Sequence, residues 1–209
     1  MTLGLLNRIG VKTSFEGSII MVWPKTHVEP TELVVESDWS SASYFYSIVA
    51  LSEIGSEIKL SSYRKNSLQG DGVLSEIYKL LGVQTVFEDN KIILRKIDNL
   101  KPKTLNLELY NAPDIAQTIA VTCFGLGIGC HLIGLHTLKI KETDRLEAMK
   151  AELLKFGADV SVSDKDLTLK SSRISGQQVE VDTYNDHRMA MAFGPLAMKT
   201  SFFMNDAEV

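Results

Sequence analysis

Apolar and polar residues repeat one pattern three times along the chain. Each copy has apolar residues at helical spacing, then a glycine, then two short strand-like runs around a polar turn. The copies lie at residues 3–22, 74–95 and 146–170. Because helices commonly end at a glycine in the left-handed backbone conformation, we predict a helix followed by a β-hairpin in each copy.

The glycines that end the predicted helices are regularly spaced. They are Gly10, Gly82 and Gly157, and neighbouring ones stand 72 and 75 residues apart. A period of this length indicates a repeated supersecondary unit.

Further elements are predicted between the three copies. They are helices at 40–51 and 114–127 and strands at 56–62, 104–109 and 130–135. Ser37 or Asp38 is the expected N-cap of the first of these helices, and Pro113 suits the first turn of the second.

One complete unit would therefore run strand–helix–strand–helix–strand–strand, which belongs to the α/β class. Two copies are nearly complete, at about 40–95 and 103–170. Residues 1–23 would be the last helix and hairpin of an earlier copy, and residues 193–209 belong to a third copy that is only beginning. The loop at 23–32, which contains two prolines, is expected to separate the first remnant from the rest.

Composition and charge narrow the class of protein. Of the 209 residues, 44% are hydrophobic and 23% are charged, which is typical of a globular domain with a sizeable core. The net charge of −4 gives no general attraction to nucleic acids or anionic membranes. No apolar run is long enough to span a bilayer, and the N-terminal residues lack the pattern of a signal peptide. We therefore expect a cytoplasmic protein without nucleic-acid or membrane partners.

The cysteines and histidines indicate neither a disulfide nor a metal site. Cys123 and Cys130 lie in apolar surroundings without a CxxC pattern, so we expect buried thiols in a reducing cytoplasm. His27, His131 and His136 have no metal-ligand spacing with one another or with the cysteines.

The stretch KETDRL, residues 141–146, places charges of both signs at the start of a predicted helix. Thr143 is the expected N-cap, and Asp144 would interact favourably with the helix dipole. Lys141 and Arg145 are cations where the dipole favours anions, and together with helix amides they can bracket one anion. The alternative is a solvated face of mixed charge, which the spacing alone favours.

Two further helix starts carry titratable side chains. Asp186, His187 and Arg188 precede one apolar helix, and Asp114 lies in the first turn of another. The alternatives are a capping Asn185 or Asp186 with its neighbours on the surface, and a carboxylate at position 114 that only stabilises the helix dipole.

Equivalent helix ends of a repeating fold lie on the same face of the molecule. The three charged helix starts are therefore expected to form one surface, with cations for phosphate or carboxylate groups and with Asp114 and Glu142 for proton transfer. The glycine-rich turn NSLQGDG, residues 66–72, matches no phosphate-binding fingerprint and carries little weight.

Five motifs, in this order, resemble those of the 5-enolpyruvylshikimate-3-phosphate synthases, the glyphosate-inhibited transferases of the shikimate pathway of aromatic amino acid biosynthesis. They are ESDWSSASYF, RKNSLQGDG, APDIAQTIA, IKETDRLEAM and TYNDHRMAMAF. The resemblance covers essentially the whole chain. It implies an α/β fold of two similar domains, each with three βαβαββ units, in a closed inside-out barrel of the enolpyruvyl transferase type.

The family enzyme is about twice as long as this chain, so the resemblance implies the C-terminal half of it. Residues 1–35 would be a remnant of the N-terminal domain, and residues 36–209 most of the C-terminal domain without its final part. The expected partner is the missing N-terminal half of the same enzyme. We expect the barrel to be incomplete and the chain alone to have no appreciable activity.

The reaction that the resemblance implies moves the enolpyruvyl group of phosphoenolpyruvate to the 5-hydroxyl of shikimate 3-phosphate and releases phosphate. It uses no metal and no organic cofactor. Asp114 matches the proton acceptor at that hydroxyl, and Glu142 matches the proton donor to the enol carbon. Lys141 matches a residue that contacts shikimate 3-phosphate.

The remaining matches concern substrate binding. Arg145 and Arg188 match the arginines that clamp phosphoenolpyruvate, whose carboxylate and phosphate both suit a planar guanidinium. His187 lines the same site. Thr137 stands where some members of the family have an asparagine, which weakens one expected substrate contact. The family's late lysine has no counterpart in this chain.

Two other functions stay open at this point. A UDP-N-acetylglucosamine enolpyruvyl transferase would have the same architecture, although KETDRL and NDHRMAM favour the shikimate enzyme. A non-catalytic α/β repeat module that binds an anion or a partner protein would need none of the proton-transfer residues.

Overall fold

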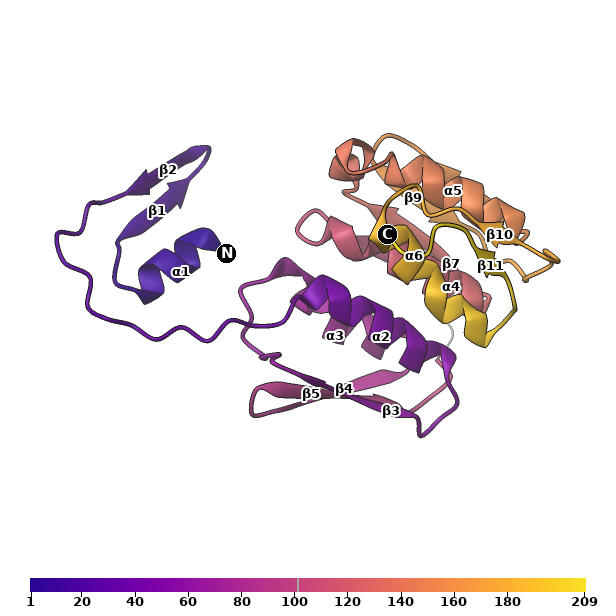
Figure 1. Cartoon of the computed structure of the whole chain (residues 1–209), viewed down its shortest axis with the longest axis horizontal. Helices are drawn as coiled ribbons and strands as arrows, with labels where there is room; N and C mark the ends of the chain where they lie inside the picture. Colours follow the sequence, from indigo (N-terminus) through magenta and orange to yellow (C-terminus); the bar gives the residue numbers. More distant parts are fainter. Residues whose placement is uncertain (101) are drawn as a thin grey trace.

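The computed structural model describes residues 1–100 and 102–209. A small N-terminal lobe lies apart from a larger α/β body (Figure 1). The lobe contains α1 (Thr2–Arg8), β1 (Thr13–Glu16) and β2 (Ile19–Val22), with the two strands antiparallel. Residues 23–38, all of them described, connect the lobe to the body without a helix or strand. The predicted helix, hairpin and loop are confirmed, and the assignment of residues 1–35 to a second domain stays a prediction.

The first unit of the body begins with a helix and ends with a hairpin. It contains α2 (Trp39–Leu51), β3 (Glu57–Ser61), the 3-10 turn η1 (Gly70–Val73), α3 (Leu74–Lys79), β4 (Val83–Glu88) and β5 (Lys91–Lys96). Its strands form one antiparallel sheet in the order β3–β5–β4. Of the two expected N-caps of α2, Asp38 is the one observed, because its carboxylate accepts a hydrogen bond from Ser40 N.

The second unit has the complete predicted order. It contains β6 (Thr104–Glu108), η2 (Pro113–Ile115), α4 (Ala116–Leu126), β7 (Gly129–Ile133), η3 (His136–Ile140), α5 (Arg145–Lys155), β8 (Val160–Val162) and β9 (Asp166–Leu169). The sheet order is β6–β7–β9–β8, and only β6 and β7 are parallel. The helix predicted at 114–127 differs at its start. Residues 113–115 form a 3-10 turn, the tighter geometry that helix ends often adopt.

The third unit is present only in part within the described residues. It contains β10 (Glu180–Val181), α6 (His187–Phe193), η4 (Gly194–Met198) and β11 (Phe203–Met204), and its two strands are parallel. The α-helix passes into a 3-10 turn at Gly194, directly before Pro195, because proline has no N–H to donate to an α-helical hydrogen bond. A third unit is present, as predicted, but it begins with β10 and α6, before the predicted start at residue 193.

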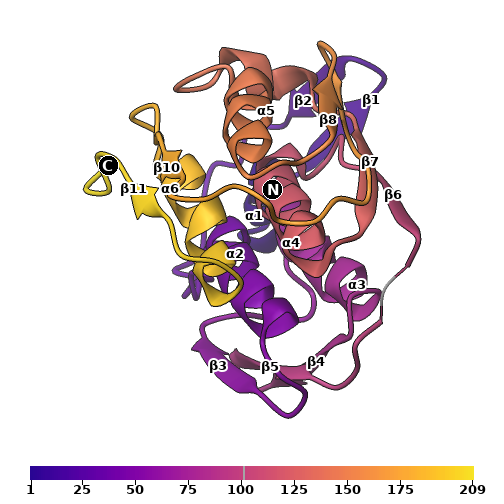
Figure 2. The ribbon, with the colours of Figure 1, turned by 90° about the vertical axis from the view of Figure 1, so that its right-hand side faces the viewer.

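The first helix of each unit, which is α2, α4 or α6, lies in the centre, and the sheets lie outside these helices (Figure 2). This is the predicted inside-out arrangement, although the sheets of the described residues do not close into a barrel. Tyr78 of α3 packs against Tyr46 of α2, and Phe156, after α5, packs against Phe124 of α4 and Phe193 of α6. Aromatic side chains from the outer elements therefore pack against the central helices.

The glycines that end the three predicted helices have the left-handed backbone conformation that the sequence predicts. Gly10, Gly82 and Gly157 have φ angles of 79°, 79° and 87°. This left-handed conformation reverses the chain into each hairpin at little steric cost to glycine. Among the described residues, no helix combines the length and the apolar character needed to cross a bilayer.

A ladder of buried hydroxyl groups joins α2 to α4. Ser43 Oγ lies 2.9 Å from Thr118 Oγ1, and one turn further along both helices Ser47 Oγ lies 2.8 Å from Thr122 Oγ1. The hydroxyl of Tyr78 lies 2.9 Å from the same Thr122 oxygen. Small side chains allow the two helices to approach, and each buried hydroxyl has a partner. The ladder therefore sets where the N-termini of α2 and α4 lie relative to each other.

Replacing Thr122 by valine is expected to lower the free energy of unfolding by about 1–3 kcal/mol, because the hydroxyls of Ser47 and Tyr78 lose a buried partner. Urea unfolding measures this change. Thr104→Val, at an exposed strand position, is the matched control and should change stability by less than about 0.5 kcal/mol. Equal stability of Thr122→Val and the unaltered chain would show that the ladder contributes nothing.

Candidate active site

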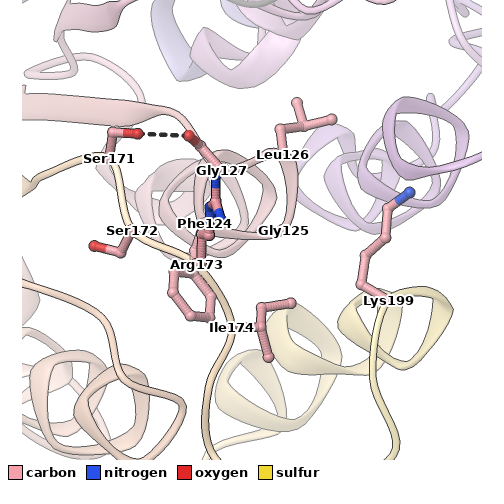
Figure 3. A pocket seen from close by; sticks show the side chains of 9 residues that line it. All are labelled: Phe124, Gly125, Leu126, Gly127, Ser171, Ser172, Arg173, Ile174 and Lys199. Carbon is pink, nitrogen blue, oxygen red and sulfur yellow. Dashed lines mark hydrogen bonds between the residues drawn. The ribbon is translucent and has the colours of Figure 1, made fainter.

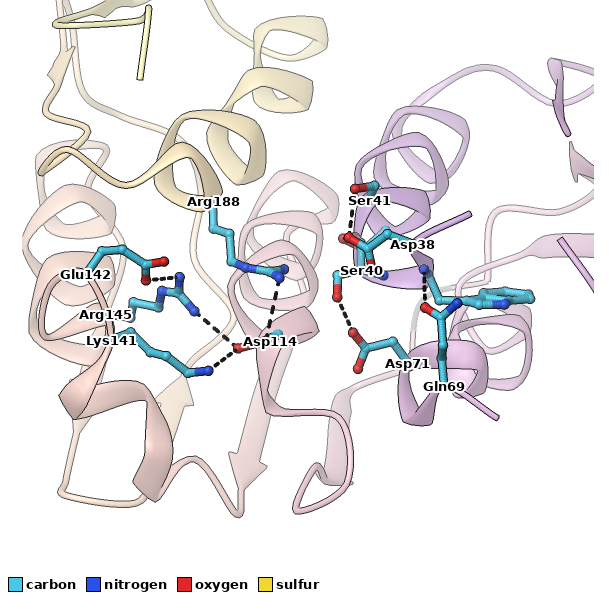
Figure 4. A network of polar contacts seen from close by, with 12 residues as sticks. Asp38, Ser40, Ser41, Gln69, Asp71, Asp114, Lys141, Glu142, Arg145 and Arg188 are labelled. Carbon is cyan, nitrogen blue, oxygen red and sulfur yellow. Dashed lines mark hydrogen bonds and ion pairs between the residues drawn. The ribbon is translucent and has the colours of Figure 1, made fainter. Parts of the chain in front are cut away.

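Three helix starts come together on one rim of the body. They are the 3-10 turn before α4, the loop and first residue of α5, and the first turn of α6 (Figure 4). Five of the predicted side chains form one network of hydrogen bonds and ion pairs there: Asp114, Lys141, Glu142, Arg145 and Arg188. The prediction that separate helix starts converge is confirmed for these residues.

The Asp114 carboxylate forms ion pairs with three cationic side chains. Its Oδ1 lies 3.1 Å from Arg145 Nη1 and 3.4 Å from Lys141 Nζ, and its Oδ2 lies 3.6 Å from Arg188 Nη2. The side chain is 26% exposed, so the carboxylate is still open to solvent and to a ligand. A partly open carboxylate among cations can still accept a hydrogen bond from a bound hydroxyl group.

Arg145 begins α5, and its N-cap is a correction to the sequence analysis. Asp144, not Thr143, caps this helix, because the Asp144 carboxylate accepts hydrogen bonds from Leu146 N and Glu147 N at 3.2 and 3.3 Å. Both residues are good caps, so the sequence alone cannot decide between two N-cap positions that differ by one residue.

The side chain of Arg145 is only 2% exposed and is surrounded by carboxylates. Its Nε donates to Asp186 Oδ2 at 2.6 Å and its Nη2 to Asp186 Oδ1 at 3.3 Å. The same Nη2 donates to Glu142 Oε2 at 2.5 Å. An anionic ligand can therefore bind Arg145 only by displacing Glu142 or Asp114, since Asp186 is 0% exposed.

The network contains as many negative as positive groups. Lys141, Arg145 and Arg188 face the carboxylates of Asp114, Glu142 and Asp186. A site with this balance has little positive charge left over for a ligand that carries several negative charges. Binding such a ligand tightly would take further cations from outside these helix starts.

A second wall faces this network from the start of α2 and from η1 (Figure 4). Ser40 Oγ donates a hydrogen bond to Asp71, and Ser41 Oγ donates to Asp38 at 2.9 Å. Burial raises the pKa of the Asp71 carboxyl, and the charge of Asp114 adds to the rise, while the hydrogen bond from Ser40 opposes it. Asp71 thus lies close enough to Asp114 for the two charges to interact.

Sequence reasoning missed two residues of this region. Asp186 was grouped with His187 and Arg188 at one helix start, but the only role considered for it was that of a cap. It is a cap, and it is also the buried partner of Arg145. Asp71 entered only within a glycine-rich turn of little weight. No pattern along the chain marks Asp186 as buried or Asp71 as half-buried, because burial depends on helices far away in sequence.

Two predicted substrate-binding residues lie beside the network and not in it. His187 is the first residue of α6 and is exposed, and no hydrogen bond or ion pair within the described residues links it to Asp114 or the arginines. Thr137 lies in η3, and its buried hydroxyl has no hydrogen-bond partner in the described part of the chain. Their expected roles stay predictions.

Cys123 and Cys130 are buried free thiols, and the hydrogen bond between them, followed by burial, raises the pKa of Cys123. No cluster of three or more histidine, cysteine or acidic side chains suited to a metal ion occurs within residues 1–100 and 102–209.

A cavity lies at the C-terminal end of α4, whereas Asp114 lies before its N-terminal end (Figure 3). It is lined by the C-terminal residues of that helix together with residues 171–174 and Lys199, and Ser171 Oγ donates to Gly127 O at 2.7 Å. Arg173 and Lys199 are favourably placed beside the negative end of the helix dipole, which explains these cations without a ligand.

Residues 1–206 match the family model of EPSP synthase (3-phosphoshikimate 1-carboxyvinyltransferase). The chain is 40% identical over 202 residues to the 3-phosphoshikimate 1-carboxyvinyltransferase of Bacteroides fragilis (strain YCH46), a match that covers 95% of this chain and 48% of the relative. It is 33% identical over 209 residues to that of Photobacterium damsela subsp. piscicida, covering 99% and 48%.

A solved structure of EPSP synthase from Acinetobacter baumannii superimposes with a TM-score of 0.78 and 23% identity. The match covers 98% of this chain and 49% of that one, and at this identity it supports the fold alone. The chain spans about half the length of the curated relatives it matches.

Replacing Arg145 by methionine is expected to lower the free energy of unfolding by about 3–5 kcal/mol, because Asp186 would be left as a buried, uncompensated charge. The matched control is Arg188→Met, which removes a single, longer ion pair at a partly exposed site and should cost less than about 1 kcal/mol. Urea unfolding of both variants gives the comparison. Similar losses for the two arginines would contradict the role of Arg145 as the buried centre of the network.

Asp71 is expected to make stability depend on pH in a known direction. Because its folded pKa is raised, its stabilising effect is present below the ordinary aspartate pKa and is lost as the pH rises through the raised value. The unaltered chain should therefore lose stability relative to Asp71→Asn as the pH rises above the ordinary aspartate pKa of about 4.

Asp164 offers a control of opposite sign for this measurement, because the hydrogen bond from Lys139 lowers the pKa of its carboxyl. Relative to Asp164→Asn, the unaltered chain should gain stability as the pH rises through the acidic range. Unfolding free energies at several pH values decide both cases, and a difference between Asp71→Asn and the unaltered chain that does not vary with pH would contradict the first.

Proposed function

Because the chain belongs to the EPSP synthase (3-phosphoshikimate 1-carboxyvinyltransferase) family, we propose that it supplies one half of an active site for enolpyruvyl transfer. The substrates would be phosphoenolpyruvate and shikimate 3-phosphate, and phosphate would be released. The observation that carries this proposal is the partly exposed Asp114 carboxylate, which lies among Arg145, Lys141 and Arg188 on a rim of converging helix starts.

The reaction that fits this site proceeds by addition and then elimination. The 5-hydroxyl oxygen bonds to C2 of phosphoenolpyruvate, and Asp114 accepts the hydroxyl proton. The C3 methylene takes a proton and becomes a methyl group in the tetrahedral intermediate. Loss of phosphate and of one C3 proton then restores the double bond in the product.

Glu142 is the proposed proton donor to C3. Its side chain is 49% exposed and touches Arg145 through one oxygen, so it is the most easily displaced carboxylate of the network. It would act after a substrate anion has taken its place on Arg145 and the carboxyl has gained a proton. The exchange replaces one charge-assisted contact of the guanidinium by another, so the arginine stays paired throughout.

The charge balance supports a site that needs a second half. Both substrates carry a phosphate and a carboxylate, whereas the three cations of this rim already face three carboxylates. We propose that the rest of the enzyme adds cations across the rim and closes over the substrates. The free thiols of Cys123 and Cys130 support a reducing compartment, and we propose the cytoplasm.

The test uses this chain alone and a chimaera in which the unmatched parts of the Bacteroides fragilis relative are joined to it. Phosphate release with both substrates should be measurable for the chimaera and at background for the chain alone. In the chimaera, Asp114→Asn and Glu142→Gln should each lower kcat by about 10²–10⁴-fold. Glu147→Gln, an exposed position in the first turn of α5, is the control and should stay within about twofold.

Each alternative gives a different result in this assay. Turnover by the chain alone near that of the chimaera would contradict the half-site. Unchanged turnover in Asp114→Asn and Glu142→Gln would favour a non-catalytic anion-binding role for these helix starts. A preference of the chimaera for UDP-N-acetylglucosamine over shikimate 3-phosphate would identify the other enolpyruvyl transferase.

A further inference from the structure

The segment between β10 and α6 is held by α5 at two points. Glu152 and Arg145 lie two turns apart on one face of α5, and both are buried. The Glu152 carboxylate accepts hydrogen bonds from Asp182 N at 3.1 Å and from the Tyr184 hydroxyl at 2.7 Å. Arg145 holds the other end of the segment through Asp186. One helix face thus fixes the chain from residue 182 to residue 186.

The backbone of this segment has an unfavourable conformation. Tyr184 and Asn185 both have positive φ angles, of 58° and 54°. Two successive residues other than glycine in the left-handed region cost of the order of 1–3 kcal/mol each, so the contacts of α5 have to hold the turn. The turn directs the Asp186 carboxylate inward, where it also accepts a hydrogen bond from Arg188 N at 2.9 Å and caps α6.

The guanidinium of Arg145 has two functional edges, and Asp186 occupies the buried one. The Nε and Nη2 edge pairs with the two oxygens of Asp186. The Nη1 and Nη2 end faces Asp114 and Glu142, whose side chains are 26% and 49% exposed. A ligand can replace either of these carboxylates, but it cannot reach Asp186. The position of the buried edge therefore determines where the open end points.

We propose that Asp186 is a positioning residue that presents the Nη1 and Nη2 end of Arg145 to an anionic group of the substrate. Through the same carboxylate it sets the first turn of α6 and hence the backbone of Arg188. One buried side chain thereby couples the two arginines of the site to each other. The substrate part of this inference rests on the proposed function, whereas the placement of Arg145 does not.

The first measurement needs no activity and uses the full chain. In a sample labelled with ¹⁵N-arginine, the Arg145 Nε–H should exchange with solvent at least about a hundredfold more slowly than that of the exposed Arg8, because Asp186 accepts from it in a buried site. Exchange of Arg145 as fast as that of Arg8 in the unaltered chain would overturn the proposal, whether or not any variant folds.

The variant Asp186→Asn sharpens the test. Asparagine remains a good N-cap for α6, but an amide NH₂ replaces the oxygen that accepts from Arg145 Nε. The Arg145 Nε–H should then exchange at least about tenfold faster than in the unaltered chain. Glu147→Gln, at an exposed position in the first turn of α5, is the control. It makes the same change from carboxylate to amide and leaves the contacts of residues 182–186 in place, so it should change this rate less than about threefold.

Steady-state kinetics of the chimaera test the claim that Asp186 acts on substrate binding through Arg145. Asp186→Asn should raise the KM for phosphoenolpyruvate at least about tenfold, with a smaller effect on kcat, because a misplaced guanidinium weakens binding before it affects the chemical step. Glu147→Gln should change this KM less than about threefold. Faster Nε–H exchange together with an unchanged KM would overturn the claim that Asp186 acts on substrate binding.

Failure of the proposed function would look different. A chimaera that releases no phosphate in its unaltered form refutes the proposed function, while the exchange rates of Arg145 in the full chain still decide whether Asp186 positions it. Unaltered exchange in Asp186→Asn would overturn the proposal even where the chimaera is fully active.

Discussion

The ion pair between Arg145 and Asp186 is the interaction on which the rest of the site depends. A guanidinium that is 2% exposed and a carboxylate that is 0% exposed tolerate burial only because each compensates the other. The pair joins the start of α5 to the start of α6, and the same guanidinium reaches Asp114 before α4. Three helix starts that are distant in the sequence therefore share one electrostatic centre.

The packing of the central helices makes that centre possible. Hydroxyl-bearing and other small side chains allow α2 and α4 to lie against each other, with the ladder of Ser43, Ser47, Thr118 and Thr122 between them. Tyr78 of α3 and Phe156, directly after α5, pack against aromatic rings of the central helices. The first helices of the second and third units, α4 and α6, begin at the same rim, and the start of α5, the second helix of its unit, completes it. A repeating fold in this way turns separate charged motifs into one surface.

The rim has the character of half a site. Its cations are matched by its own carboxylates, and its most exposed carboxylate, that of Glu142, occupies Arg145 in the position where a substrate anion would bind. The chain matches about half the length of its curated relatives, which agrees with that balance. In the proposed enzyme, the internal carboxylates keep the buried arginine paired until a substrate replaces one of them.

The amino-acid sequence by itself determined the repeating unit, the α/β class and most of the helices and strands, because apolar periodicity and the glycines at helix ends are local signals. It also placed Asp114, Glu142, Arg145 and Arg188 in one candidate site through the motifs that carry them. Only the tertiary structure decided that Asp144 and not Thr143 caps α5, because both residues are suitable caps and packing selects the register. Only the tertiary structure gave Asp186 its second role, since the burial of a carboxylate and the identity of its partner depend on which helices meet, and no local pattern encodes that meeting.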